Sequence, residues 1–186
     1  MTGKIFFTPA LISSLIACLL MLDRSLAETS DRLDNPARWS LITDQVMGGV
    51  SSGEKTTGDD KAGAYVGLTG LVSTQNNGGF IQIRHNLEAY DLTGKKAVKL
   101  TVSGNNERYY VFIRTKTLLL PWQFYAADFR ATPEPSEVVL PLANFERSNF
   151  YMRRQFKPEN IKSIGIVAYG RDHKADIKVH GVGFTE

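Results

Sequence analysis

Residues 108–114 read RYYVFIR, and this run decides the fold class. It is rich in aromatic and β-branched residues and too short for a helix, which predicts a β-strand. A second run, FIQIR at residues 80–84, alternates apolar and polar residues in the same way. Side chains of a strand point alternately to its two faces. The predicted shared polar face therefore carries Gln82, Arg84, Tyr110, Phe112 and Arg114.

Similar short runs continue along the chain, and no sustained 3.6-residue apolar stripe appears beyond one turn near residues 158–160. Further strands are expected at residues 64–72, 98–102, 122–129, 137–140, 161–169 and 175–184. Glycine-, asparagine- and proline-rich turn signals separate them. About eight or nine strands at this spacing predict an all-β sandwich or jelly roll.

The first 27 residues have the layout of a secretory signal peptide. Lys4 precedes an apolar run from Ile5 to Leu22, and Ser25-Leu26-Ala27 resembles a cleavage site. A retained membrane anchor is the alternative, since 18 apolar residues are just enough to span a bilayer. A lipid on Cys18 is a third reading. We therefore expect an exported chain, periplasmic or extracellular, with an extension at residues 28–38 and one domain at residues 39–185.

Composition restricts the chemistry of the mature chain. Cys18 is the only cysteine, so no disulfide, thiolate metal site or cysteine nucleophile is expected after cleavage. Without Lys4, Asp23 and Arg24 the chain holds 20 basic and 18 acidic residues, a net charge of +2. This excess is too small and too dispersed to predict a nucleic-acid partner.

Catalytic and metal-binding signals are weak. His173 follows Asp172, but no serine lies near it in sequence to act as a nucleophile. Zinc lacks a recognisable set of ligands. A structural calcium ion held by Asp59, Asp60 or Asp172 stays open. We expect no enzyme activity, no catalytic residue and no cofactor.

Residues 44–53 (DQVMGGVSSG) form the most informative loop. The glycine pair permits a positive φ or a close backbone approach, and Asp44 and Ser51 can bond to nearby amides. Alone, this pattern predicts only a structured turn leading into a strand.

Taken in order with later segments, the loop resembles one known family. The other segments are NGGF at residues 77–80 with Arg84, YY at 109–110 with Arg114, PWQFY at 121–125 with Phe129, LPL at 140–142 with Phe145, and IGI at 164–166 with Gly170. Together, from about Trp39 to Phe184, they resemble the complex I intermediate-associated protein 30 family. The resemblance implies a galactose-binding-domain-like jelly roll. It also implies a chaperone-like assembly factor for respiratory NADH:ubiquinone oxidoreductase, although the export leader departs from the mitochondrial setting of that role.

The predicted function is binding of a protein partner, with respiratory-complex subunits implied by the resemblance. The alternative is an extracytoplasmic carbohydrate-binding module of the same fold, and a plain solvated face remains a third reading of the two arginines. Membrane contact is expected only through the leader or Cys18. The predicted binding residues are Asp44, Met47, Gly48, Gly49, Asn77, Gln82, Arg84, Tyr110, Arg114, Trp122 and Tyr125.

Overall fold

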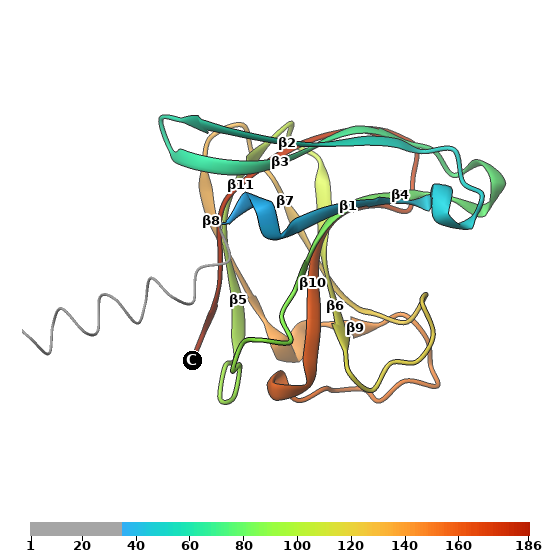
Figure 1. Cartoon of the computed structure of the whole chain (residues 1–186), viewed down its shortest axis with the longest axis vertical. Coiled ribbons are helices and arrows are strands. Elements are labelled where there is room, and N and C mark those ends of the chain that lie inside the picture. The colour runs from blue at the N-terminus through green and yellow to red at the C-terminus, as the bar shows by residue number, and fades with distance from the viewer. Residues whose placement is uncertain (1–34) are drawn as a thin grey trace, which may run out of the picture. The chain divides into compact units, whose positions relative to one another are not determined.

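A computed structural model describes residues 35–186, and the long elements of this part of the chain are all β-strands (Figure 1). The predicted leader, residues 1–27, and the first part of the predicted extension lie outside the described residues. The strands are β1 (Trp39–Thr43), β2 (Ser52–Asp60), β3 (Gly63–Val72), β4 (Phe80–Asn86), β5 (Ala97–Gly104), β6 (Arg108–Thr115), β7 (Tyr125–Arg130), β8 (Ser136–Pro141), β9 (Glu146–Arg147), β10 (Ile161–Tyr169) and β11 (His173–Thr185). Single 3-10 turns span Pro36–Arg38, Asp44–Met47, Gln75–Asn77, Leu142–Asn144 and Pro158–Asn160.

These strands form two antiparallel sheets. Sheet A has the order β1-β4-β10-β6-β7-β9, and sheet B has the order β2-β3-β11-β5-β8. Neighbouring strands in each sheet are mostly far apart in sequence, as in a jelly roll. The predicted all-β jelly-roll sandwich is therefore confirmed.

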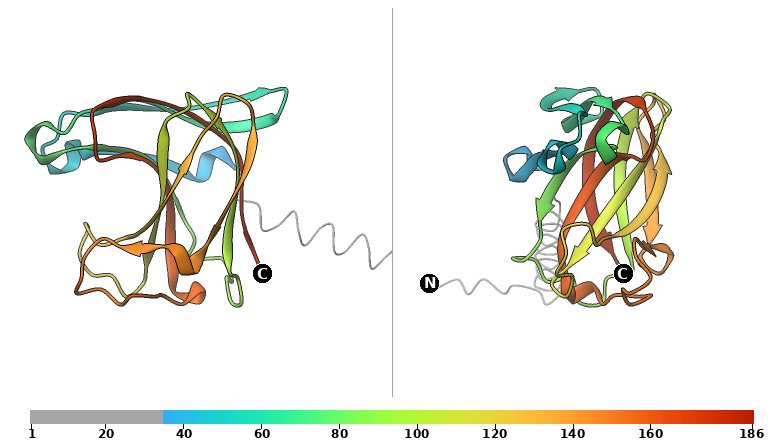
Figure 2. Two further views of the ribbon diagram at one scale, coloured as in Figure 1. Left: turned by 180° about the vertical axis from the view of Figure 1, so that it is seen from behind. Right: turned by 90° about the vertical axis from the view of Figure 1, so that its right-hand side faces the viewer.

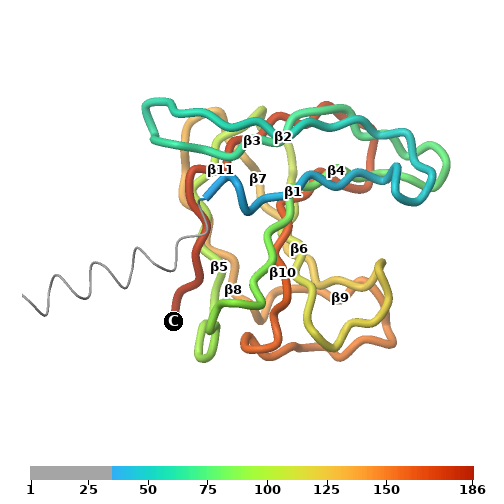
Figure 3. Tube along the Cα trace, viewed as in Figure 1, coloured from blue at the N-terminus to red at the C-terminus, as the bar shows by residue number. Residues whose placement is uncertain are grey.

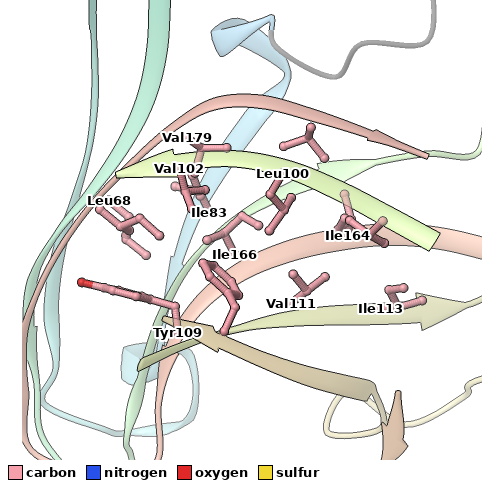
Figure 4. Packing of buried hydrophobic residues seen from close by; sticks show 14 of the residues in the cluster. Leu68, Ile83, Leu100, Val102, Tyr109, Val111, Ile113, Ile164, Ile166 and Val179 are labelled. Atoms are coloured by element: carbon pink, nitrogen blue, oxygen red, sulfur yellow. The ribbon is translucent and has the colours of Figure 1, made fainter. Parts of the chain in front are cut away.

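The sheets join through an apolar core that the alternation of the strands creates (Figure 4). Ile81 and Ile83 of β4, and Val111 and Ile113 of β6, are fully buried, as their predicted face requires. Leu100 and Val102 of β5 meet them from sheet B. Burial of such a side chain contributes about 1.5–3 kcal/mol each.

Strand β11 bends where its pairing changes partner. It pairs with β3 from His173 to Val179 and with β5 from Ile177 to Thr185, with an irregularity between Val179 and Gly181. From behind, β11 (dark red) runs along the β2–β3 hairpin and then turns down beside β5 (Figure 2). A β-bulge is the usual cause of such a bend.

The structure contains three strands that the sequence did not predict, β1, β2 and β9, so the described residues hold eleven and not eight or nine. β2 reads SGEKTTGDD, without an apolar alternation, and β9 has two residues. Strand β7 also begins at Tyr125, three residues later than predicted, because Leu120 and Gln123 close a turn before it. Figure 3 traces this connection between β6 and β7.

Candidate functional site

The predicted polar face is the outer face of sheet A, which we define by the side chains that point away from the core. Gln82 pairs with Val167 and Val167 with Tyr110, while Arg84 pairs with Gly165 and Gly165 with Phe112. The register therefore brings Gln82, Arg84, Tyr110 and Arg114 onto one face across β4, β10 and β6. Their shared face is confirmed, and their role in binding stays a prediction.

Gly165 lies in the middle of this outer face, beneath the side chain of Gln82. An added Cβ atom there would lie 2.7 Å from Oε1 of Gln82 and 3.6 Å from Cγ2 of Val167. Glycine inside a strand often marks the close approach of a ligand or another backbone. Here the end of the Gln82 side chain occupies the space that a side chain at position 165 would need, and Gly165 itself is buried.

A pocket of about 340 Å³ lies at one end of the face, where β4 and β6 end and β10 begins. Its lining contains five cationic side chains and no acidic one: Arg38, Arg84, Arg114, Lys116 and Lys162. The other lining residues are Ser40, Asn86, Leu118 and Ser163. We call this the cationic pocket. Glu88 approaches Lys162 at 3.7 Å, and Asn86 also binds the Glu88 carboxylate.

Two arginines of the cationic pocket lack an acidic partner. Among the described residues, no carboxylate pairs with Arg84 or Arg114. Nη2 of Arg114 donates to the carbonyl of Leu120 at 3.0 Å, and its Nε is buried without a hydrogen-bond partner in the described chain. Burial, and then the nearby charge of Arg114, lower the pKa of Arg84. An anion bound near Arg84 would oppose this shift, because an opposite charge favours the charged form of the guanidinium.

Aromatic rings cover the face beside the pocket. Phe124 stacks on Phe112 with ring centroids 3.8 Å apart, and Tyr169 packs edge-on against Phe112 at 5.2 Å and Tyr110 at 5.8 Å. Because the rings mostly pack on one another, only Tyr169, 39% exposed, presents substantial surface.

The loop at residues 44–51 lies at the opposite end of β4, where Asp44 acts as a structural lock. The buried Asp44 carboxylate accepts hydrogen bonds from the Ser51 amide (3.0 Å), the Ser51 hydroxyl (2.5 Å), the Gly79 amide (2.6 Å) and the Phe80 amide (3.3 Å). Burial alone would raise the pKa of Asp44, but these hydrogen bonds outweigh it and lower the pKa. Because Asp44 is fully buried and its bonds stay within the chain, direct contact with a partner is excluded for it.

Two glycines make the lock possible. A methyl group at Gly49 or Gly78 would overlap the Asp44 carboxyl group. Gly48 adopts the left-handed conformation, with φ +88°, which ends the 3-10 turn after Met47. The loop therefore presents Met47, together with Val46 and Val50, to solvent. Asn77, on the loop that donates to Asp44, is also exposed.

The two aromatic predictions from residues 122–125 have different outcomes. Tyr125 is 2% exposed and its hydroxyl donates to the Arg153 carbonyl. Its prediction as a binding residue is therefore wrong, because the side chain is buried. Trp122 is 57% exposed but stands on the loop before β7, not on the sheet face.

A serine, a histidine and an aspartate lie near one another although the sequence did not predict it, because the three residues are far apart in the chain. Ser103 Oγ lies 3.2 Å from Nε2 of His180, whose Nδ1 lies 3.8 Å from Asp60. The distance between His180 and Asp60 is too long for a hydrogen bond. Lys178 binds the Asp60 carboxylate at 2.8 Å instead. Ser103 is also buried. This arrangement therefore lacks the oriented base and accessible nucleophile of a catalytic triad.

His173 shows no partner suited to catalysis either. Its Nδ1 lies 2.8 Å from the carbonyl of Arg171, and Nε2 has no partner in the described residues. Asp172 instead accepts from the amide and hydroxyl of Thr74. Over residues 35–186, no cluster of three or more His, Cys, Asp or Glu side chains is placed to hold a metal ion. The same residues contain no helix of a length and apolarity that would cross a membrane.

Several residues of the site were not predicted from sequence. Arg38, Lys116, Lys162 and Gly165 join it only through the strand order and register. The alternation of residues 161–169 could have placed Ser163 and Gly165 on one face, but not beside Arg84.

Comparison with known proteins decides the family. A sequence model of complex I intermediate-associated protein 30 matches residues 28–179, most of the chain. The chain belongs to this family. The resemblance read from the six motifs is thereby confirmed, while no curated protein matches the chain significantly.

Solved structures show which fold this family member shares. A family 11 carbohydrate-binding module from Clostridium thermocellum, in complex with a β-1,3-1,4-mixed-linked tetrasaccharide, superimposes with a TM-score of 0.66 at 13% identity, covering 83% of this chain and 94% of that chain. A family 30 module of a cellulosomal cellulase from the same organism gives 0.61 at 10% identity, covering 84% and 96%. Such low identity shows the fold alone, a galactose-binding-like jelly roll.

Proposed function

We propose that this member of the complex I intermediate-associated protein 30 family is an exported, non-catalytic assembly factor that holds a protein partner on the outer face of sheet A. Its partner would be a respiratory-complex subunit, as the family implies. The observation that carries the proposal is the cationic pocket, where Arg84 and Arg114 have no carboxylate partner among residues 35–186.

The chemistry of the pocket favours an acidic segment of the partner. Guanidinium groups bind carboxylates in a fixed, bidentate geometry and lose less hydration energy than ammonium groups. Arg84 is partly buried, and Gly165, its partner on β10, separates it from Phe112 of the aromatic group. A glutamate or aspartate side chain could thus enter the pocket while neighbouring residues cover the aromatic rings. Such buried arginine and aromatic groups commonly dominate the energy of an interface.

Affinity purification tests this proposal. The tagged chain is recovered from the membranes and exported fraction of its own cells, and bound proteins are identified by mass spectrometry. We expect specific respiratory-complex subunits with wild type, and at least about tenfold less of them with Arg84→Ala, because a buried charge pair is lost. Lys99→Ala is the matched control, since it removes an exposed cation from sheet B that pairs with Glu137 at 2.6 Å. If Arg84→Ala recovered as much of these subunits as Lys99→Ala does, the pocket would have no role in holding the partner.

Carbohydrate binding is the second proposed function, and the aromatic group on the same face favours it. Tyr169 is 39% exposed next to Tyr110, and planar rings stack on sugars through apolar contact. Glycan-array or cell-wall binding that disappears in Tyr169→Ala would support this function. Recovery of glycan alone, with no protein above background in the purification, would overturn the assembly proposal.

A further inference from the structure

Two neighbouring loops extend together beyond the end of the β7–β9 pair (Figure 3). The first, residues 116–124, enters β7, and the second, residues 148–157, leaves β9. Tyr125 pairs with Arg147, so the loops begin side by side. Ser148 fastens them: its amide donates to the Phe124 carbonyl at 2.9 Å, and its hydroxyl accepts from the Phe124 amide at 3.1 Å.

Large apolar side chains are exposed on both loops. Their exposed fractions are 88% for Leu119, 42% for Leu120, 57% for Trp122, 68% for Phe150 and 80% for Tyr151. We call these five residues the loop patch. Exposed apolar groups that gather on one surface usually mark an interaction site.

The second loop is held in place and does not depend on a partner for its shape. Nη1 of Arg147 donates to the carbonyls of Phe150 (2.8 Å) and Met152 (2.7 Å). Met152 is buried in the core, so it anchors the loop next to Phe150 and Tyr151, whose tilted rings have centroids 3.8 Å apart. The backbone of this loop therefore has a fixed conformation, and the apolar side chains of Phe150 and Tyr151 are exposed to solvent from it.

The charges of these loops have a single sign. Residues 116–124 and 148–157 contain no aspartate or glutamate and include four cations: Lys116, Arg153, Arg154 and Lys157. Lys157 has an acidic neighbour, Glu159, at 3.9 Å, and the charge of Lys116 interacts with Glu88. No carboxylate of the described residues pairs with Arg153 or Arg154. The whole chain is nearly balanced in charge, so the absence of acids here is local.

We propose that the loop patch docks the chain on the surface of an anionic lipid bilayer. Tryptophan and tyrosine rings prefer the headgroup region, because one part of the ring system is apolar and another is polar. Leucine and phenylalanine reach deeper, and the surrounding arginines and lysines are attracted to anionic headgroups. A hydrophobic protein partner would require the same apolar groups but not the unopposed charges of Arg153 and Arg154. This docking uses neither the predicted leader nor Cys18.

Trp122 supplies the direct test. The chain has two tryptophans; Trp39 is 2% exposed in the core, so a change in fluorescence on docking reports Trp122. The full chain is mixed with vesicles of phosphatidylcholine alone or of phosphatidylcholine and phosphatidylglycerol in equal parts. We expect a blue shift with the mixed vesicles and quenching of Trp122 by brominated acyl chains. Binding should weaken by about tenfold or more in neutral vesicles or at high salt, where charges are screened.

Variants that retain Trp122 identify the surface. Leu119→Ser combined with Tyr151→Ser should lower the apparent vesicle affinity about tenfold, and so should Arg153→Glu combined with Arg154→Glu. Leu71→Ser combined with Val139→Ser is the control, because these residues of sheet B are similarly exposed, at 59% and 51%. All variants keep residues 1–34. If the apolar N-terminal run alone carries binding, every variant binds equally and Trp122 stays unquenched, which would overturn the proposal. Equal binding to neutral and anionic vesicles would also overturn it.

Discussion

At the scale of single residues, Asp44 shows how the most recognisable loop of the sequence is used. Its carboxylate collects two amides and a hydroxyl at 3.0 Å or less from both sides of the sheet end, with a fourth, longer bond from Phe80. This joins the loop at residues 44–51 to the loop before β4. Sequence spacing predicted a loop held by local hydrogen bonds, and the bond to Gly79, 35 residues away, is what spacing cannot predict.

Replacing this carboxylate should destabilise the fold. In Asp44→Asn, an amide N–H₂ would face the donors of Ser51 and Gly79, so we expect a loss of about 3 kcal/mol in the free energy of unfolding. Asp91→Asn, which removes an exposed carboxylate bonded to the Thr93 amide, should cost less than about 0.5 kcal/mol. Urea denaturation measures both changes. A loss below about 1 kcal/mol for Asp44→Asn would show that water replaces the lock.

The lock also predicts a pH dependence. Hydrogen bonds lower the pKa of Asp44 in the folded state below its ordinary value of 3.8, so the unfolded chain binds the proton more tightly. The stability that Asp44 contributes is complete above pH 3.8 and is lost as the pH falls through the lower folded pKa. Acid unfolding of wild type should therefore be steeper than that of Asp44→Asn. Parallel curves would contradict this expectation.

Gly165 is the residue at which shape and binding can be separated. An added methyl group meets the flexible end of Gln82, which can move, so Gly165→Ala should change stability by less than about 1 kcal/mol. The same methyl group would displace the Gln82 side chain, a predicted binding residue on the face beside Arg84. We therefore expect capture of the partner to fall at least tenfold while the melting temperature changes little. Undiminished capture would place the partner elsewhere on the chain.

At the scale of elements, the sheets are tied by a polar contact as well as by the core. The Tyr109 hydroxyl on β6 of sheet A accepts from the Asp176 amide of sheet B at 2.8 Å and donates to Asn105 at 2.7 Å. Figure 4 shows this oxygen pointing out of the aliphatic cluster. Tyr109→Phe should cost about 1–2 kcal/mol, since it removes the acceptor of the Asp176 amide and the donor to Asn105. Tyr151→Phe, on an 80% exposed ring, should cost almost nothing in thermal unfolding.

Tyr109 also limits stability at high pH. Burial raises its pKa from 10.0 to about 12 in the folded chain. The raised value means that the folded state holds the proton more tightly, so its contribution is complete below pH 10 and is lost as the pH rises toward 12. Wild type should lose stability over this range faster than Tyr109→Phe. Equal alkaline curves for the two proteins would refute this link.

The elements also explain what sequence could and could not predict. Residues 80–86 and 108–115 form strands with the predicted faces because the core-facing side of each is apolar, and residues 161–169 form a strand as predicted. Residues 52–60 escaped prediction because β2 is a polar strand at the edge of sheet B. The cationic pocket could not be predicted from the sequence for another reason. Arg38, Lys116 and Lys162 meet only because β1, β4, β10 and β6 are neighbours, an order that no local pattern encodes.

At the scale of the whole described domain, the two proposed surfaces share one loop. Lys116 and Leu118 line the cationic pocket, and the following residues carry Leu119, Leu120 and Trp122 of the loop patch. Arg114 connects them, because it lines the pocket and its Nη2 donates to the Leu120 carbonyl at 3.0 Å. A partner in the pocket would therefore lie next to the docked bilayer, which suits an assembly factor for a membrane complex.

This arrangement predicts which variants act on one function and which act on both. Arg84→Ala should reduce partner capture but leave vesicle affinity unchanged, and Leu119→Ser with Tyr151→Ser should do the opposite. Arg114→Ala should reduce both, because it removes a pocket charge and releases the loop. When Arg84→Ala is combined with Leu119→Ser and Tyr151→Ser in one chain, the changes in the free energies of partner capture and of vesicle binding should equal the sums of the separate changes. We expect agreement within about 0.5 kcal/mol, as for residues without shared contacts. If Arg84→Ala alone weakened vesicle binding tenfold, the pocket itself would be the site for lipid headgroups, and the two surfaces would be one.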